Sequence, residues 1–355
     1  FILPRNFLIT DSAKKVREYV FENAYIEAIV DLSAVNVFEN KSVYVILFIF
    51  RKKKNKTTNS NTWILECNDN EASALQDLLD KEKQKHFDYK IYTLPEAYFK
   101  TDKWYLIDSN QLDIKLQYDS FPKLDELMNL KLGLITGKDD VFIVPKTKLN
   151  QLNRELFKPL IPDRQINSYT FSKDDSKYIF YPYVSGKLIT EYELEKNYKQ
   201  TYKYLRSHLD TNRPNWWKPK SIKIPSEILV PKIITPHLSI IPKFALDLNG
   251  KYLTSHSPYI FLKEQDGHNI SDIDLLYYVL GILNSKTCFW YLTVISHKYG
   301  KSYNLLEVRE LKNLRIPFPS ADEKTYELIK YVKQRLLAKG NEISPLDEKI
   351  ESIVK

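Results

Sequence analysis

Cysteine, glycine and long apolar runs are all scarce in this 355-residue chain. Its two cysteines, Cys67 and Cys288, cannot build a disulfide framework, so we expect a protein of the reducing cytoplasm. The longest apolar run, VYVILFIF at 43–50, is too short to cross a bilayer. FILPRNF at the start has neither the basic region nor the cleavage site of a signal peptide. These absences argue against a secreted or membrane-spanning protein.

Eight glycines leave little room for a nucleotide-binding loop. The best candidate is KLGLITGKDDVFIV at 131–144, but a phosphate loop needs G-x-x-x-x-G-K-[ST]. Here only three residues, not four, separate Gly133 from Gly137, and Lys138 is followed by Asp139, whose carboxylate would repel phosphate. No G-x-G-x-x-G occurs elsewhere. The segment predicts a turn between two short strands, with glycine at positive φ.

Other catalytic signatures are also missing. The six histidines show no H-x-x-x-H spacing and no pairing with cysteine, which argues against a structural zinc site. No G-x-S-x-G nucleophile elbow is present. Acidic pairs such as Asp139–Asp140, or Asp272 with Asp274, fit solvated loops or helix caps better than the metal site of a nuclease.

Positive charge and aromatic residues are plentiful. The net charge is +8, and the chain holds 25 tyrosines and 17 phenylalanines. Residues 131–320 carry ten more Lys and Arg than Asp and Glu, whereas the rest of the chain is slightly acidic. Basic residues interleaved with Tyr and Trp are typical of nucleic-acid binding. The alternative is an ordinary lysine-rich solvated surface, and composition alone does not separate the two.

The first half of the chain predicts an α/β arrangement. FILP, IEAIVDL, SVYVILFIF and WILEC predict strands, and the unbroken apolar character of the third suits burial on both faces. A helix is predicted from about Ala13, capped by the side chain of Thr10, Asp11 or Ser12. RKKKNKTTNSN predicts a solvated loop, and residues 71–85 predict a surface helix. The pattern is that of half a doubly wound sheet.

Beyond Leu132, short apolar runs alternate with turn residues and predict a strand-rich α+β domain. YIFYPYV, EILVPKII, KYLTSHSPYIFL and LRIPFP predict strands or strand ends. Helices are predicted over 192–209 and 274–295. The tail predicts an amphipathic helix whose apolar face holds Tyr326, Ile329, Val332, Leu336 and Leu337. We therefore expect domains at 1–130 and 131–320 and a helical segment at 321–355.

These segments resemble a known family. FILPRNFL, KKVREYVFEN, IEAIVDLSAVNVF and SVYVILFIF resemble, in order, the later part of the catalytic domain of gamma-class adenine-N6 DNA methyltransferases. LGLITGKDDVFIV, LFKPLIPDRQINSY, the RPNWW segment, LVPKIITPHLS, YYVLGILNSKTCFWYL and HKYGKSYN resemble the TaqI-like target-recognition domain. That domain occurs in type IIG restriction-modification enzymes and related phage-defence methyltransferases. The resemblance is weakest over 89–130.

The resemblance implies a partly formed methyltransferase sheet followed by a DNA target-recognition domain. It implies that Phe38, in NVFENK, packs against an extruded adenine, whose lost stacking needs an aromatic replacement. The alternative is a core residue that anchors the loop. Pro4 matches a structural proline at a strand end.

The family binds S-adenosylmethionine through a glycine-containing motif and holds the adenine with N-P-P-Y, and neither occurs in this chain. We therefore expect a portion of a longer enzyme, with an upstream methyltransferase half as partner, that is inactive alone and binds no cofactor itself. A nuclease fused to the parent would also lie upstream.

Double-stranded DNA is the partner that the resemblance implies for residues 131–320, with phosphate contacts supplying affinity and polar side chains reading base edges. The candidate DNA contacts are Thr136, Lys138, Arg164, Arg213, Trp216, Lys218, His297, Lys298, Lys301 and Tyr303. Trp216 and Trp217 have an alternative role, packing beneath a loop. Two rival hypotheses remain: a structural piece with little DNA affinity of its own, and an enzyme assembled with a separate upstream polypeptide.

Overall fold

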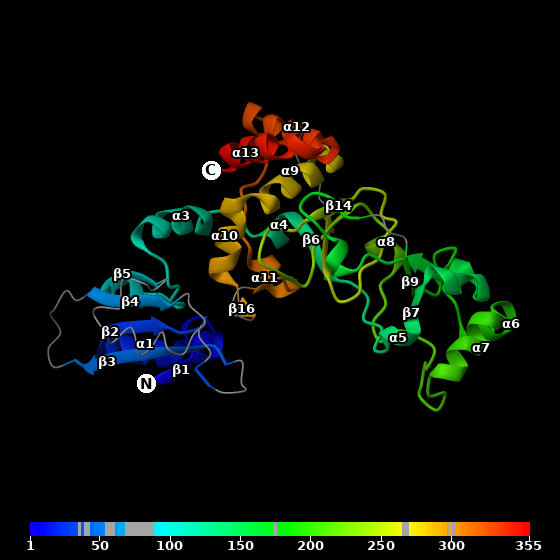
Figure 1. Ribbon diagram of the computed structural model, residues 1–355, viewed down its shortest axis with the longest axis horizontal. Coiled ribbons are helices and arrows are strands. Elements are labelled where there is room, and N and C mark those ends of the chain that lie inside the picture. The colour runs from blue at the N-terminus through cyan, green and yellow to red at the C-terminus, as the bar shows by residue number, and fades with distance from the viewer. Residues whose placement is uncertain are drawn as a thin grey trace. The chain divides into compact units, whose positions relative to one another are not determined.

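The computed structural model describes residues 1–34, 37–38, 43–53, 61–67, 89–172, 176–264, 270–296, 298–299 and 303–355. Figure 1 shows the element order. The chain forms two compact units. The first unit contains residues 1–120 and 293–304, and the second contains 121–292 and 305–355. The predicted loop over 54–60 and the predicted helix over 71–85 lie outside the described residues.

The first unit is built on one mixed five-stranded sheet of order β1-β3-β2-β4-β5. Its strands are β1 (Ile2–Pro4), β2 (Ala24–Asp31), β3 (Val45–Lys52), β4 (Asn61–Cys67) and β5 (Tyr89–Pro95). Only β2 and β4 pair in parallel, and the other neighbours pair antiparallel. The four predicted strands are confirmed as β1 to β4.

One face of this sheet is covered. The helix α1 (Lys14–Asn23) crosses it (Figure 1), and an aromatic core that includes Phe48, Phe99 and Trp104 fills the space. The short 3₁₀ segments η1 (Arg5–Leu8), η2 (Asp11–Ala13) and η4 (Glu96–Lys100) and the helix α3 (Ser109–Asp119) complete the unit. The predicted side-chain cap of α1 is wrong, because η2 runs directly into α1 and no side chain accepts a capping hydrogen bond.

The other face of the sheet is apolar and partly open. Register places Ile2, Leu47, Val30, Leu65 and Ile91 in one row across all five strands. The ends of this row are exposed, as are Ile49 and Trp63 in the neighbouring row. The prediction that the third strand is buried on both faces therefore holds only for its first half.

The second unit contains several small sheets. Its main sheet is antiparallel, of order β14-β12-β15-β6. These strands are β6 (Met128–Leu132), β12 (Lys232–Ile234), β14 (Ala245–Asp247) and β15 (Pro258–Leu262). A second sheet, β7-β9-β8, holds β7 (Ile143–Pro145), β8 (Phe157–Pro159) and β9 (Lys177–Phe180). The remaining strands of the second unit are β10 (Tyr183–Val184), β11 (Lys187–Leu188) and β13 (Leu238–Ser239). The strand β16 (Lys298–Tyr299) and most of β17 (Tyr303–Leu305) belong to the first unit.

Three strand predictions need correction. EILVPKII begins as the short helix α8 (Pro225–Ile228) and becomes β12 only after a break. KYLTSHSPYIFL is a strand only in its last part, β15. LRIPFP forms no regular strand, and Arg315 makes only an isolated bridge to Lys123. Proline interrupts or delimits the backbone hydrogen-bond ladder in all three segments.

Both long predicted helices are broken in two. Residues 192–209 form α6 (Glu191–Asn197) and α7 (Lys199–His208), and residues 274–295 form α9 (Asp272–Asn284) and α10 (Lys286–Ile295). The tail forms α12 (Glu323–Leu337) and α13 (Ile343–Val354), which pack together, with α12 against α9 (Figure 1). Other short helical segments are α4 (Leu124–Leu127), α5 (Asp139–Phe142), η5 (Lys146–Gln151), η6 (Arg154–Leu156), η7 (Asp163–Gln165), α11 (Val308–Asn313) and η8 (Gly340–Glu342).

The buried face of the tail helix differs from the predicted one. Tyr326 and Leu337 are exposed, whereas Arg335 is buried. Arg335 is accommodated because its guanidinium donates to Asp347 at 2.6 Å and lies over the Tyr169 ring.

Candidate nucleic-acid interface

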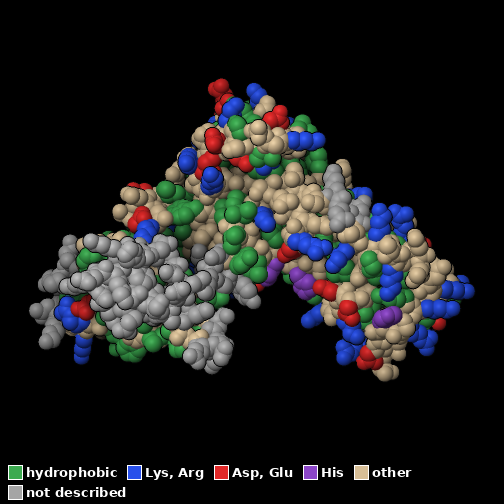
Figure 2. Space-filling view, in the orientation of Figure 1, with side chains coloured by type: hydrophobic (Ala, Val, Ile, Leu, Met, Phe, Trp, Pro, Cys, Tyr) green, Lys and Arg blue, Asp and Glu red, His purple; other side chains and the backbone are tan. Residues whose placement is uncertain are grey.

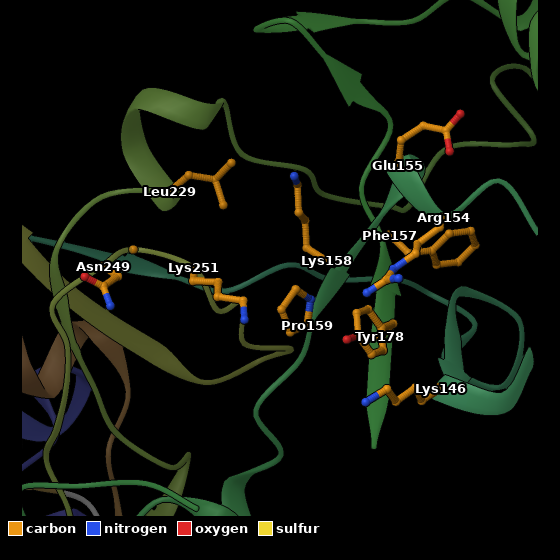
Figure 3. A pocket seen from close by; sticks show the side chains of 11 residues that line it. Lys146, Arg154, Glu155, Phe157, Lys158, Pro159, Tyr178, Leu229, Asn249 and Lys251 are labelled. Atoms are coloured by element: carbon orange, nitrogen blue, oxygen red, sulfur yellow. The ribbon is translucent and has the colours of Figure 1, made fainter. Parts of the chain in front are cut away.

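A basic groove of about 720 Å³ opens between two parts of the second unit (Figure 3). One wall comes from the small sheet and the 3₁₀ segments beside it, and the other from the turn after β14. Four cations line the groove: Lys146, Arg154, Lys158 and Lys251. Glu155 is the single acid among the lining residues. None of the four cations forms an ion pair with another described residue, so their charge is free to meet an anion.

The floor of the groove is rigid because its apolar side chains belong to a core. Phe157 on β8 and Tyr178 on β9 are buried in a cluster that also contains Trp217. The antiparallel pairing of β8 with β9 fixes their spacing. Lys146 follows β7 directly, and Lys158 lies on β8 between two buried neighbours. The cations are thus presented by ordered backbone.

The opposite wall is held by a buried ion pair. Lys232 on β12 is fully buried and its Nζ lies 2.9 Å from the Asp247 carboxylate. Asp247 also accepts the backbone N–H of Lys251 at 3.3 Å and of Tyr252 at 3.0 Å. Burial lowers the pKa of Lys232, and the attraction of Asp247 opposes that shift. The carboxylate therefore ties β12 to the turn that carries Lys251.

Glycine is required in this turn. Gly250 has φ +62°, and a Cβ on it would lie 2.6 Å from the backbone carbon of Val230. Only glycine can take this positive φ and also leave room for the Val230 backbone without strain. Asn249, Gly250 and Lys251 therefore form a stiff edge to the groove (Figure 3).

Within the segment at 133–139 the chain bends at Gly137, as predicted, but the short helix α5 follows the bend where a strand was expected. Gly137 has φ +78°, and the hydroxyl of Thr136 donates to the Asp139 carboxylate within the turn. Gly133 serves a different purpose, because a Cβ there would lie 2.4 Å from the carbonyl oxygen of Thr254. Both glycines thus shape the backbone.

The sequence-predicted DNA contacts are divided between the two units, since those at 297–303 belong to the first, and none is among the residues that line the groove. Lys138, Arg164 and Arg213 are exposed. The Nζ of Lys138 is 3.4 Å from the carbonyl oxygen of His208, and Arg213 pairs with Asp210 at 3.3 Å. These side chains remain accessible to a ligand.

Two predicted contacts are internal. Thr136 is 2% exposed, and its hydroxyl is used within its own turn. Trp216 is 9% exposed and its indole N–H donates to Glu191 at 2.8 Å. Trp216 and Trp217 both belong to the core beside the groove, so the alternative role, packing beneath a loop, describes them correctly. Lys218 is half-buried and lies over the Trp217 ring.

The remaining predicted contacts concern residues 297–303. Tyr303 on β17 is exposed. His297 and Lys301 lie outside the described residues, as does the side chain of Lys298 on β16. Of the groove cations missed from the sequence, only Lys251 had a local signal, because it follows the turn-forming pair Asn249–Gly250.

In the first unit, Phe38 is 41% exposed, which does not match the alternative of a core anchor. The sheet carries one buried ion pair, Arg5 to Asp31 at 2.7 Å. Burial acts to raise the pKa of Asp31, but Arg5 and the hydrogen bonds from Ser33 outweigh it and hold that pKa below its usual value.

Residues 1–132 contain no glycine, whereas the family's S-adenosylmethionine motif includes one. Among the described residues, no group of three or more His, Cys, Asp or Glu is placed to hold a metal ion. No helix in the described part of the chain is long and apolar enough to cross a membrane.

Comparison with known proteins identifies both parts of the chain. A family model for N-6 DNA methylase matches residues 1–104, and one for the TaqI-like C-terminal specificity domain matches residues 181–316. The chain combines an N-6 DNA methylase segment with a TaqI-like specificity domain. This confirms the family resemblance and the mixed α/β fold class. The TaqI-like specificity domain includes the Asn249–Lys251 wall of the groove.

Similar curated proteins are type II restriction-modification enzymes. The type II restriction enzyme and methyltransferase RM.Eco57I of Escherichia coli is 23% identical over 91% of this chain and 34% of its own length. The type II methyltransferase M.BanIII of Aneurinibacillus aneurinilyticus is 24% identical over 96% of this chain and 64% of its own length. This chain thus spans less than two thirds of either relative.

A similar fold occurs in the type IIL restriction-modification enzyme MmeI, solved in complex with DNA. The TM-score is 0.60 at 11% identity, over 100% of this chain and 46% of that one. At this identity the likeness concerns the fold alone.

Proposed function

We propose that this chain is the DNA-recognition portion of an adenine-N6 DNA methyltransferase from a restriction-modification system. The second unit binds double-stranded DNA, and the groove cations Lys146, Arg154, Lys158 and Lys251 contact its phosphates. The observation that carries the proposal is the match of residues 181–316 to the TaqI-like specificity domain, which supplies one wall of that groove.

The electrostatics of the groove suit a polyanion. Duplex DNA carries one phosphate charge per about 1.7 Å of helix axis, so a row of cations meets several phosphates at once. Four cations and one carboxylate line the groove. Phosphate contacts position a protein on DNA, whereas base edges specify the site. The exposed Arg164, Arg213 and Lys138 remain candidates for base or phosphate contacts outside the groove.

The test is fluorescence anisotropy with a labelled pool of random duplexes, titrated at several NaCl concentrations. Because each neutralised phosphate contributes about −0.9 to the slope of log K against log salt, four contacts predict a slope near −4. Binding that does not depend on salt, or no binding at low salt, contradicts the proposal.

We further propose that an upstream methyltransferase half of the same protein completes the first unit and supplies the S-adenosylmethionine site. The support is the free edge of β1 and the apolar face beside it. Ile2 is 56% exposed, and β1 pairs with β3 alone. Free sheet edges and apolar faces are normally covered in a stable protein. Phe38 then contacts the extruded adenine, and this chain alone does not methylate DNA.

Mixing this chain with the upstream polypeptide tests the assembly. Methyl transfer from labelled S-adenosylmethionine to duplex DNA is expected only for the mixture, and Phe38→Ala is expected to reduce it. Activity of this chain alone contradicts the proposal, as does a stable first unit that never associates with the upstream polypeptide.

The second candidate function is a structural piece with little DNA affinity outside its parent. The exposed apolar row of the first unit favours it, because such a surface promotes self-association. Size-exclusion chromatography combined with the anisotropy assay separates the two functions. A self-associated chain without salt-dependent DNA binding supports the structural piece.

A further inference from the structure

The loop that follows β13 exposes two adjacent large apolar side chains. Ile240 is 53% exposed and Ile241 is 49% exposed, and Pro242 follows them. Each lies in the TaqI-like specificity domain. Isolated exposed isoleucines are common. Two consecutive β-branched residues at a loop tip, however, expose apolar surface to water and gain no packing contacts that would offset the cost.

This loop is held by hydrogen bonds at its tip. The Ser239 hydroxyl donates to the carbonyl oxygen of Ile241 at 2.6 Å, which closes a tight turn around Ile240. The Ser168 hydroxyl donates to the carbonyl oxygen of Pro242 from a separate segment of the chain. The exposed isoleucines therefore project from fixed backbone.

Both ends of the loop are anchored as well. The Asp163 carboxylate accepts the backbone N–H of His237 at 2.8 Å. The buried side chain of Asn284 makes two hydrogen bonds to the backbone of Phe244. Its amide oxygen accepts the Phe244 N–H at 3.2 Å, and its amide nitrogen donates to the Phe244 carbonyl oxygen at 2.8 Å. The side chains of Asp163, Ser168 and Asn284, each 40 or more residues from its partner in the loop, thus position it together with Ser239, which pre-organises the isoleucines for contact.

One anchoring segment carries an exposed cation, Arg164. Arg164 follows Asp163, is exposed, and forms no ion pair with another described residue. Asp163 also accepts the Ser257 hydroxyl, which brings the neighbouring His256 to the same end of the main sheet. His256 is exposed at φ +63°, a conformation that costs free energy in a residue other than glycine. An apolar tip near an exposed guanidinium fits a partner that offers both anionic groups and apolar surface.

We propose that Ile240 and Ile241 form an apolar wedge that enters a base step of the bound duplex. The inference rests on the proposed DNA binding by the second unit. A phosphate satisfies Arg164, and base faces that have lost their stacking neighbour supply the apolar surface. Inserted apolar side chains are a known way to fill an unstacked step. A protein partner that covers the loop is the rival, and the test below separates them.

The test compares two 30-base-pair duplexes of otherwise identical sequence, one intact and one with a central abasic site, by anisotropy with the full chain. The abasic duplex already has a gap, so the wedge enters it without unstacking a base. We expect at least about fivefold tighter binding to the abasic duplex, because unstacking is costly. Ile240→Ser with Ile241→Ser is expected to remove this preference and to change the affinity for the intact duplex at most about twofold.

The matched control is Ile224→Ser with Ile273→Ser, which removes two other exposed isoleucines of the same unit. This control is expected to keep the preference for the abasic duplex. Far-UV circular dichroism melts check that both variants fold. Equal binding of both duplexes by the wild type, or a preference that survives in the Ile240/Ile241 variant, overturns the wedge. Absence of salt-dependent binding to either duplex overturns instead the DNA-binding function on which the wedge rests.

Discussion

The two units leave very different surfaces exposed. In the first unit, the open face of the sheet presents Ile49, Trp63 and Ile91, each close to half exposed or more. In the second unit, the groove presents unpaired cations, and Figure 2 shows Lys and Arg side chains gathered over the part that carries α6 and α7. An apolar face is stabilised by contact with protein, whereas a cationic groove is stabilised by an anion. Under the proposed function, the two surfaces serve two partners of opposite chemistry.

The strongest test of this contrast uses two tryptophans. Trp217 is 2% exposed in the core beside the groove, whereas Trp63 is 59% exposed on the open face. Trp217→Ala is expected to lower the free energy of unfolding by about 3–5 kcal/mol, through lost burial and the cavity left behind. Trp63→Ala is expected to change it by no more than about 0.5 kcal/mol. Urea denaturation followed by circular dichroism measures both. A large effect of Trp63→Ala would show that its face is already covered.

A second test compares two lysines in ion pairs of the main sheet. Lys232→Met leaves the Asp247 carboxylate buried without its cation, and we expect a loss of about 3 kcal/mol in the free energy of unfolding. Lys131 pairs with Glu227 at 2.5 Å, but both side chains are about one third exposed. Lys131→Met is therefore expected to cost less than about 1 kcal/mol. Equal effects of the two substitutions would contradict the role given to the buried pair.

A third test removes groove charge alone. Lys158→Ala with Lys251→Ala is expected to weaken binding to the random duplex pool roughly thirtyfold, and to make the salt slope shallower by about 2. The control is Lys199→Ala with Lys330→Ala, two exposed lysines of the second unit that lie outside the groove. Both double variants lose the same net charge. If they weaken binding equally, the groove has no special role.

The smallest expected effect concerns pH and the first unit. The pKa of Asp31 is held below its usual value in the folded state, so its pair with Arg5 adds stability above about pH 4, and this is lost as the pH falls through the lowered pKa. We expect Asp31→Asn to cost about 1.5 kcal/mol near neutral pH and less in acid. The control is Glu27→Gln, on the same strand as Asp31, which breaks an exposed pair with Arg51 on β3. Unfolding curves between about pH 7 and pH 3 measure the difference. A cost of Asp31→Asn that is constant with pH would contradict this account.

Local sequence patterns correctly predicted those strands and turns that depend mainly on neighbouring residues. The strands β1 to β4 follow continuous apolar runs, and the turn at Gly137 follows from the freedom of glycine at positive φ. The breaks in the two long helices were not predicted. A capping side chain can end one helix and start the next, even where the apolar pattern continues. Ser285 ends α9, and its hydroxyl accepts the backbone N–H of Cys288 at the start of α10. Apolar periodicity carries no signal for such a break.

The groove was beyond reach of sequence reasoning for a different reason. Its cations come from residues 146–158 and from Lys251, and only the folded sheets bring these segments to one opening. Trp216 was a candidate DNA contact, because aromatic residues beside basic ones suit DNA, with packing beneath a loop as the alternative. Its indole packs beside the groove and donates to Glu191. Burial of a tryptophan depends on tertiary packing, which a short motif does not reveal.

The order of strands in the main sheet also governs how this protein is made. The strand β6 has no partner in that sheet except β15, which begins at Pro258, more than a hundred residues later in the chain. At ribosomal rates of about 5–20 residues per second, β6 waits roughly 6–25 s for β15 to be synthesised. During that interval its backbone edge and its apolar side chains are open to chaperones or to mispairing. Slowing translation between β6 and β15 is therefore expected to lower the yield of folded protein more than slowing it after β15.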